Sequence, residues 1–213
     1  IKDHVNLAVF YNELGLAYDG ISEFSRAKIN YLKSVDYAIK VNDDRLQGWI
    51  YNNIGNVHTE GFKNTDSAVY YYKKSLDLAK KLKDTAEIFT PILNIGWTYV
   101  DQGDYDIAYP YLVKSEKMIF TKYGDDSAKS QINFLLGRYY MFKDKLVLAN
   151  NYFKTSIDYA KKENLLDELT DTYKQYSILA DKQGNYELAY DRLQTHLKYR
   201  DSLFNEAKIK ENQ

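Results

Sequence analysis

The stretch "NIGWTYVDQGDYDIA", residues 94–108, decides the fold class of this chain. Its first half places Ile95, Tyr99 and Val100 at helical spacing, yet Gly96 stands among them. A glycine inside a helix costs about 1 kcal/mol relative to alanine, so a packing constraint should account for it. The following "QGDYD" is rich in turn residues, and a second helical pattern starts near Ala108. The stretch therefore predicts a helix, a tight turn and a second helix.

The same pattern recurs along the chain, in "NELGLAYDG" at 12–20, "NNIGNVHTEG" at 52–61 and "FLLGRYYMF" at 134–142. Aligning these stretches puts four glycines in register at steps of 40, 41 and 41 residues: Gly15, Gly55, Gly96 and Gly137. An alanine follows in every unit: Ala27, Ala68, Ala108, Ala149 and Ala189. In the fifth unit Ser177 stands at the glycine position. Five units of about 40 residues indicate a helical repeat protein.

Further positions agree between the units. Four residues after the alanine comes a bulky side chain (Tyr31, Tyr72, Leu112, Phe153 and Leu193), and seven after it a serine or histidine (Ser34, Ser75, Ser115, Ser156 and His196). Spacings of four and seven mark one face of a helix. We expect the glycine and the alanine to be small because the two helices of a unit approach closely there.

Polar residues at the turns predict where the helices begin. We expect the second helices to open at Ser22, Thr65, Asp104, Asp144 and Asn185, and the following first helices at Asp43, Asp84 and Asp125.

This pattern resembles the tetratricopeptide repeat, whose first helix carries a bulky–Leu–Gly–x–x–Tyr motif and whose second carries Ala–x–x–x–Phe–x–x–Ala. The period is about 40 residues where the family has 34, a variant that resembles the repeat arrays of Bacteroidetes-type sensor kinases and regulators. The resemblance implies an all-α, right-handed superhelical solenoid of about five helix-turn-helix repeats, with a concave face lined by first helices. We expect the array to fill residues 1–204, with repeats near 5–41, 42–82, 83–123, 124–163 and 164–204, and a C-terminal helical extension to follow at 205–213.

Composition argues against several functional classes. The formal charge of −1 creates no long-range attraction to nucleic acid, and there is no cysteine for a disulfide or a thiolate metal site. The three histidines are far apart, and no Gly-rich phosphate loop or nucleophile elbow is present. We therefore expect no catalytic residues, no metal and no cofactor. The 22 tyrosines are expected at helix seams, where one edge of the ring meets water.

A ligand groove is the better functional hypothesis. By analogy with the family, concave positions on the first helices give a candidate groove of Trp49, Asn52, Asn56, Leu93, Trp97, Phe134 and Arg138. Its amides would bind a peptide backbone, its apolar side chains would hold an apolar residue, and Arg138 would prefer an acidic group. Repeats 1 to 3 have no Lys or Arg at the family's carboxylate-clamp positions, which disfavours the acidic tail of a chaperone.

Two functions stay open at this level. The first is a non-enzymatic, protein- or peptide-binding sensory or regulatory domain of a bacterial signal-transduction protein, and the second is a free-standing scaffold for complex assembly. Because the chain begins at Ile1, we expect it to be a piece of a longer protein. We expect no nucleic-acid partner and no direct membrane insertion of this fragment, and the extension at 205–213 could mediate a homodimer. The compartment is open, with the periplasm favoured over the cytoplasm by the resemblance to membrane-anchored sensors.

Overall fold

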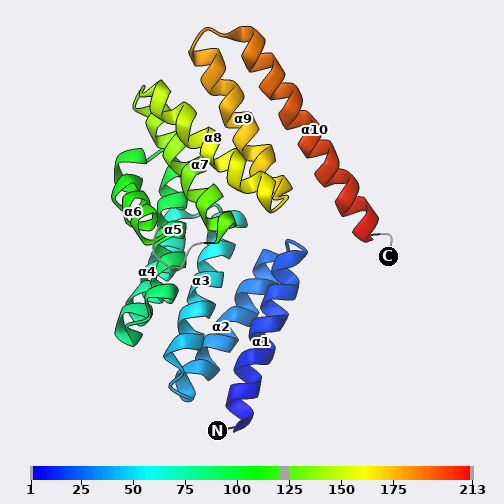
Figure 1. Cartoon of the computed structure of the whole chain (residues 1–213). Helices are drawn as coiled ribbons and strands as arrows, with labels where there is room; N and C mark the ends of the chain where they lie inside the picture. The colour runs from blue at the N-terminus through cyan, green and yellow to red at the C-terminus, as the bar shows by residue number, and fades with distance from the viewer. Residues whose placement is uncertain (1, 120–124, 212–213) are drawn as a thin grey trace. The chain divides into compact units, whose positions relative to one another are not determined.

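In the computed structural model, which describes residues 2–119 and 125–211, the described chain folds into ten helices and no strands (Figure 1). They are α1 (Lys2–Gly20), α2 (Phe24–Lys40), α3 (Asp44–Glu60), α4 (Thr65–Leu82), α5 (Thr85–Gln102), α6 (Tyr105–Met118), α7 (Asp126–Phe142), α8 (Leu146–Lys162), α9 (Leu166–Lys182) and α10 (Tyr186–Glu211). The fold is all-α, a helical repeat solenoid. No helix in the described ranges is long and apolar enough to cross a membrane.

The chain divides into two compact units, residues 1–111 (unit 1) and residues 112–213 (unit 2). In unit 1, α1 packs on α2, α3 packs on α4, and the pairs are joined by contacts of α2 with α3 and of α4 with α5. In unit 2, α7 packs on α8 and α9 packs on α10, and α8 contacts α9. The expected repeat boundary between residues 123 and 124 lies outside the described residues. Helix α10 continues past residue 204 as far as Glu211.

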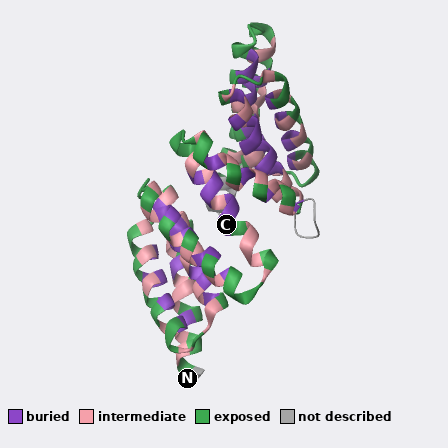
Figure 2. Ribbon diagram, turned by 90° about the vertical axis from the view of Figure 1, so that its left-hand side faces the viewer, coloured by how far each residue is buried: buried purple, intermediate pink, exposed green. Residues whose placement is uncertain are grey.

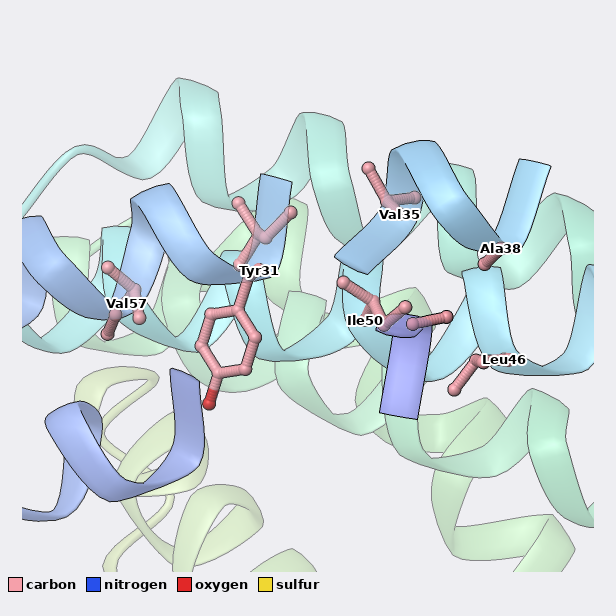
Figure 3. Close-up of a cluster of buried hydrophobic side chains, with 9 residues drawn as sticks. Tyr31, Val35, Ala38, Leu46, Ile50 and Val57 are labelled. Atoms are coloured by element: carbon pink, nitrogen blue, oxygen red, sulfur yellow. The ribbon is translucent and has the colours of Figure 1, made fainter. Parts of the chain in front are cut away.

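Within both units, the buried residues follow the helix faces that meet one another (Figure 2). In unit 1, one cluster joins α1, α2 and α3 and includes Tyr31, Val35 and Ile50 (Figure 3). The helices are therefore held together by the apolar face that the repeat pattern predicts.

The repeat glycines make room for a ring from the second helix of the same pair. A Cβ atom on Gly15 would lie 2.5 Å from two ring carbons of Tyr31, and one on Gly137 would lie 2.6 Å from two ring carbons of Phe153. A Cβ atom on Gly55 would overlap the ring of Tyr72 in the same way. The expectation that the glycines permit close helix approach is confirmed in these three repeats.

The serine positions serve the same close contact. Ser34 on α2 is fully buried and donates to the carbonyl oxygen of Ala8 on α1 at 2.6 Å. In unit 2, Ser130 on α7 donates to the carbonyl oxygen of Ser156 on α8 at 3.1 Å. The small hydroxyls of Ser34 and Ser130 let the helices approach and still form a hydrogen bond, whereas the buried hydroxyl of Ser115 has no partner among the described residues.

The first-helix caps agree with the expectation from sequence. The side chains of Asp43, Asp84 and Asp125 accept backbone N–H groups at the starts of α3, α5 and α7. Among the second-helix caps, Asn185 accepts from the backbone N–H of Leu188 at 3.1 Å.

Three other expected caps are wrong. Thr65 is already inside α4, which Asn64 caps by accepting the N–H of Ser67. Ser22 and Asp144 adopt left-handed conformations with φ of 59° and 56°, and the caps of α2 and α8 are the following residues, Glu23 and Lys145. The reason is that each turn needs one residue at positive φ before the helix starts, a role that small polar side chains also fill.

Tyrosines line the seam between the helices of a pair. Stacked rings recur, with centroid distances of 5.8 Å for Tyr11–Tyr37, 5.2 Å for Tyr140–Tyr152 and 5.6 Å for Tyr173–Tyr199. Lysines lie over several of these rings, as Lys33 does over Tyr11 at 5.2 Å. All six rings are partly exposed, in agreement with the expected seam position, whereas other tyrosines, such as Tyr31 and Tyr72, are buried.

His58 of α3 is an exception in this seam. It is 6% exposed and stacks on Tyr71, with ring centroids 5.5 Å apart. Neither ring nitrogen has a hydrogen-bond partner among the described residues. Burial, aided by the charge of Lys28, lowers the pKa of His58, so the ring is held in its neutral form.

Candidate functional site

The predicted groove residues are distributed over both units. Unit 1 carries Trp49, Asn52 and Asn56 on α3 and Leu93 and Trp97 on α5, whereas unit 2 carries Phe134 and Arg138 on α7. The two groups are therefore described separately.

The first helices of unit 1 are joined by asparagine side chains. The Nδ2 group of Asn94 on α5 donates to Oδ1 of Asn52 at 3.1 Å and to Oδ1 of Asn56 at 3.3 Å, both on α3. One repeat earlier, Nδ2 of Asn53 on α3 donates to Oδ1 of Asn12 on α1 at 3.2 Å. The same contact therefore occurs at two successive repeats. In each case the donor is the asparagine two residues before a repeat glycine (Asn53 or Asn94), and an acceptor is the asparagine three residues before the preceding repeat glycine (Asn12 or Asn52).

A set of hydroxyl groups fixes the orientation of Asn56. The hydroxyl of Tyr72 on α4 donates to Oδ1 of Asn56 at 2.8 Å, and Thr59 lies 3.1 Å from the same hydroxyl. Burial raises the pKa of Tyr72, which therefore stays protonated and available as a donor. Because the oxygen of Asn56 receives both Tyr72 and Asn94, its amide N–H groups point away from these partners.

Amide donors are thereby left for a ligand. The Nδ2 groups of Asn52 and Asn56 donate no hydrogen bond to any described residue, and both side chains are partly exposed. The asparagines at 52 and 56 were expected from sequence. The Tyr72 contribution was missed, because its position in the second helix reads only as a packing site.

The two tryptophans lie about one helical turn from the amide cluster along the chain, Trp49 before Asn52 on α3 and Trp97 after Asn94 on α5. Trp49 is 49% exposed, and its Nε1 donates to Oε2 of Glu87 at 2.6 Å. Trp97 is partly exposed, and its Nε1 donates to Oδ2 of Asp101 at 2.8 Å. Each indole N–H already has a carboxylate acceptor, so what these residues present to a ligand is mainly the ring face.

Leu93 and Phe134 are much less accessible than the two tryptophans. Leu93 is 4% exposed and Phe134 is 6% exposed. In unit 2, Phe134 packs against Phe153 with ring centroids 6.4 Å apart, and the guanidinium of Arg138 lies 5.6 Å over its ring. Both apolar side chains are largely taken up by packing and leave a ligand little apolar surface.

One end of the unit 1 face is acidic. The hydroxyl of Tyr31 lies 3.5 Å from Oδ2 of Asp19 on α1, and desolvation raises the pKa of that carboxyl. Desolvation and the charge of Asp19 also raise the pKa of Glu60 on α3. Two carboxylates in one another's field favour a cationic group or a hydrogen-bond donor nearby. In the described parts of the chain, no cluster of three or more acidic or histidine side chains could hold a metal ion.

Comparison with known proteins gives one match by sequence. Residues 91–120 match the tetratricopeptide repeat family model, a stretch that begins inside α5 and runs through α6. No curated protein matches the sequence.

Several solved structures share the fold. BtubC (BKLC) from P. vanneervenii is 14% identical with a TM-score of 0.75, covering 95% of this chain and 84% of its own. A Rap protein in complex with Competence and Sporulation Factor is 15% identical with a TM-score of 0.77, covering 93% and 56%. The Rap conjugation gene regulator of plasmid pLS20, in complex with the Phr* peptide, is 20% identical with a TM-score of 0.74, covering 92% and 54%. The chain thus spans a little over half the length of these two Rap structures, and the likeness concerns the fold alone.

The matched repeat contains the Gly96 and Ala108 positions that recur through the chain, and the paired helices reproduce the architecture of the structural relatives. This chain therefore shares the helical-repeat fold of these structures, and its residues 91–120 are similar to a tetratricopeptide repeat.

Proposed function

We propose that this chain is a non-enzymatic binding array that takes an extended peptide segment of a partner on the first-helix face of unit 1, formed by α1, α3 and α5. The observation that carries the proposal is the pair of oriented, unused amide groups of Asn52 and Asn56. An extended peptide presents backbone carbonyl oxygens at regular intervals, and amide N–H groups bind these without regard to sequence.

The neighbouring groups supply selectivity in this proposal. The ring faces of Trp49 and Trp97 take apolar side chains, and the acidic end at Asp19 and Glu60 takes a basic one. Leu93 serves as the packing support beneath the face, whereas Phe134 and Arg138 lie in unit 2 and are not part of the site proposed on unit 1. A peptide ligand is consistent with the fold, because a Rap protein of the same architecture is known in complex with the Phr* peptide.

The biological setting is proposed on the same basis. We favour a sensory or regulatory domain of a bacterial signal-transduction protein, associated with a membrane-anchored sensor in the periplasm, and a free-standing scaffold is the alternative. A homodimer through the C-terminal part of α10 belongs to the first setting. The sequence downstream of residue 213 in the full-length protein distinguishes the signalling domain from the scaffold. A kinase, a membrane helix or a DNA-binding region there favours signalling.

The experiment starts from a displayed library of random peptides selected on the whole chain. The selected peptide is then titrated against Asn56→Asp by calorimetry. This variant keeps the oxygen that accepts Tyr72 and Asn94 but removes both N–H donors, so we expect at least tenfold weaker binding. The matched control is Asn150→Asp in unit 2, whose Oδ1 accepts the hydroxyl of Tyr176 at 2.9 Å in the same manner, and which should bind as wild type does.

A second variant tests whether the ring of Trp97 contributes to peptide binding. Trp97→Ala should cost about 2 kcal/mol of binding if the ring is an anchor, whereas Lys73→Ala on α4 should cost almost nothing. A peptide whose affinity survives both Asn56→Asp and Trp97→Ala, in variants that circular dichroism shows to be folded, would place the site elsewhere.

A further inference from the structure

Unit 2 buries an arginine that has no carboxylate partner. Arg192 on α10 is 8% exposed, and its Nη1 donates to the backbone carbonyl of Tyr176 on α9 at 3.0 Å. Its guanidinium carbon lies 3.2 Å from the centre of the Tyr176 ring. Among the residues that the structure describes, no acidic side chain comes within ion-pair distance of Arg192.

The fifth repeat is built differently from the others at this place. In the other repeats the bulky residue four after the alanine is at most 2% exposed, as Tyr31, Tyr72, Leu112 and Phe153 show, whereas Leu193 is 42% exposed. Ser177 stands where the preceding repeats have glycine. Helix α10 instead turns Arg192, the preceding residue, into the contact with Tyr176.

A positively charged side chain is energetically unfavourable at this buried position between α9 and α10. Burying a charge without a counter-ion is unfavourable, and the ring and carbonyl of Tyr176 compensate for part of that cost. Burial accordingly lowers the pKa of Arg192. An uncharged side chain would avoid the cost, as tyrosine, leucine or phenylalanine does in the four preceding repeats, so packing by itself does not account for an arginine.

Aromatic and charged side chains lie along the same seam, among them Asp158 on α8. Burial and, to a smaller extent, the charge of Asp158 raise the pKa of Tyr176. The hydrogen bond with Tyr173 and, to a smaller extent, the charge of Asp158 raise the pKa of Lys161. The stacked rings of Tyr173 and Tyr199 lie along the same seam, and Lys161 on α8 lies 5.9 Å over the ring of Tyr173. His196, one turn beyond Arg192, contacts the carbonyl oxygen of Thr170 at 2.9 Å. A guanidinium has five N–H donors, and only one of those of Arg192 has a partner among the described residues.

From this geometry we propose that Arg192 is the centre of an anion site in the α9–α10 hairpin, and that its ligand is a carboxylate bound through the free edge of the guanidinium. Two parallel N–H···O bonds match a carboxylate and supply the missing counter-charge. The site lies in unit 2 and is independent of the amide cluster of unit 1. The carboxylate can come from a free organic acid or from an acidic peptide, and the experiment distinguishes the two.

The test uses the whole chain labelled with nitrogen-15. The Nε–H resonance of Arg192 is assigned by its loss in Arg192→Lys and followed during titration with sodium acetate, with sodium chloride replacing acetate to hold the ionic strength. We expect a saturable shift of this resonance and of the backbone amide of Tyr176, with no shift on addition of acetamide. Succinate and the blocked peptides Ac-Ala-Glu-Ala-NH2 and Ac-Ala-Gln-Ala-NH2 then compare a free acid, an acidic side chain and its neutral match.

The variants separate a binding role from a packing role. Arg192→Lys keeps the charge but lacks the fork, so the dissociation constant read from the Tyr176 amide should rise at least tenfold. Arg200→Gln is the matched control on the same helix, because Arg200 is exposed and already paired with Asp201 at 3.0 Å, and it should bind as wild type does. A wild-type Arg192 resonance that responds to none of the carboxylates, or responds equally to chloride, overturns the proposal. Tighter binding of the glutamate peptide than of succinate identifies a peptide ligand, and the reverse identifies a free acid.

Discussion

Helix α3 contains two glycines whose replacement by alanine should have opposite effects on stability. A Cβ atom on Gly48 would meet nothing nearer than the Cβ atom of Leu78 at 3.8 Å, which is ordinary contact. A Cβ atom on Gly55 would lie 2.6 Å from Cδ1 of Tyr72 and 2.9 Å from its Cζ. Both positions are interior to the same helix, so the gain in helix propensity, about 1 kcal/mol, is common to them.

The difference between the two variants comes from the ring of Tyr72. Cε1 of the ring lies closer still, so to restore a contact of 3.4 Å the ring must retreat by about 1 Å, but it is 2% exposed and its hydroxyl is bonded to Asn56. Overpacking of this kind costs about 1–3 kcal/mol, and weakening the hydroxyl's bond adds about 1 kcal/mol. After subtracting the propensity gain, Gly55→Ala should lower the free energy of unfolding by about 1–3 kcal/mol, whereas Gly48→Ala should raise it by up to about 1 kcal/mol.

Urea unfolding followed by circular dichroism measures both changes. In a Tyr72→Leu background, where the ring is absent, Gly55→Ala should cost much less, and this coupling tests the contact directly. A Gly55→Ala protein as stable as Gly48→Ala would refute the argument that the repeat glycines exist to admit a ring.

Three further outcomes follow from the structure. Burial lowers the pKa of His58 below its unfolded value of about 6.5, so the wild-type free energy of unfolding should be highest above that pH and fall as the pH drops from 7.5 to 5.5. The His58→Tyr variant should show a flatter dependence on pH. Identical profiles for the two proteins would contradict the assignment. Lys83→Gly should raise the free energy of unfolding by about 0.5–1 kcal/mol, because Lys83 at the end of α4 has a left-handed conformation (φ of 54°) that glycine adopts without strain. A neutral or negative change in urea unfolding would contradict the strain at this turn. Asp84→Ala should lower the free energy of unfolding by about 1–2 kcal/mol, because it removes the cap that accepts the backbone N–H groups of Ala86 and Glu87. Asp84→Asn keeps an acceptor and should destabilise less. Equal losses for the two variants would assign the effect to the ion pair with Arg45 instead.

Much of the architecture could be predicted because the same pattern of small and bulky residues recurs in each repeat. The repeat of 40 or 41 residues places Gly15, Gly55 and Gly137 at equivalent positions of their helix pairs, and the ring that each admits stands at a constant offset from the alanine. Asp43 and Asp84 cap their helices because an N-cap depends on the few residues that follow it. Such signals are local, so a single chain is enough to reveal them.

The candidate site was only partly predictable. Asn52 and Asn56 were expected on the ligand face, but their oxygens turn out to be held by Asn94 and Tyr72. Leu93 occupied an equivalent position in the repeat, yet it is buried. The repeat register says which side of a helix a residue is on, but the depth of that residue depends on the neighbouring helix.

The sequence by itself therefore determined the repeat, the helix pairs and the small residues at their contacts, since these follow from spacing along one helix. Only the tertiary structure decided which polar groups, some 40 residues apart, meet across repeats, and that Arg192 rather than Leu193 is buried beside Tyr176. The physical reason is that a helix rotated by one residue, about 100°, exchanges its buried and exposed side chains while its sequence pattern stays the same. That rotation depends on the packing of the facing helix, which the repeat spacing alone does not specify.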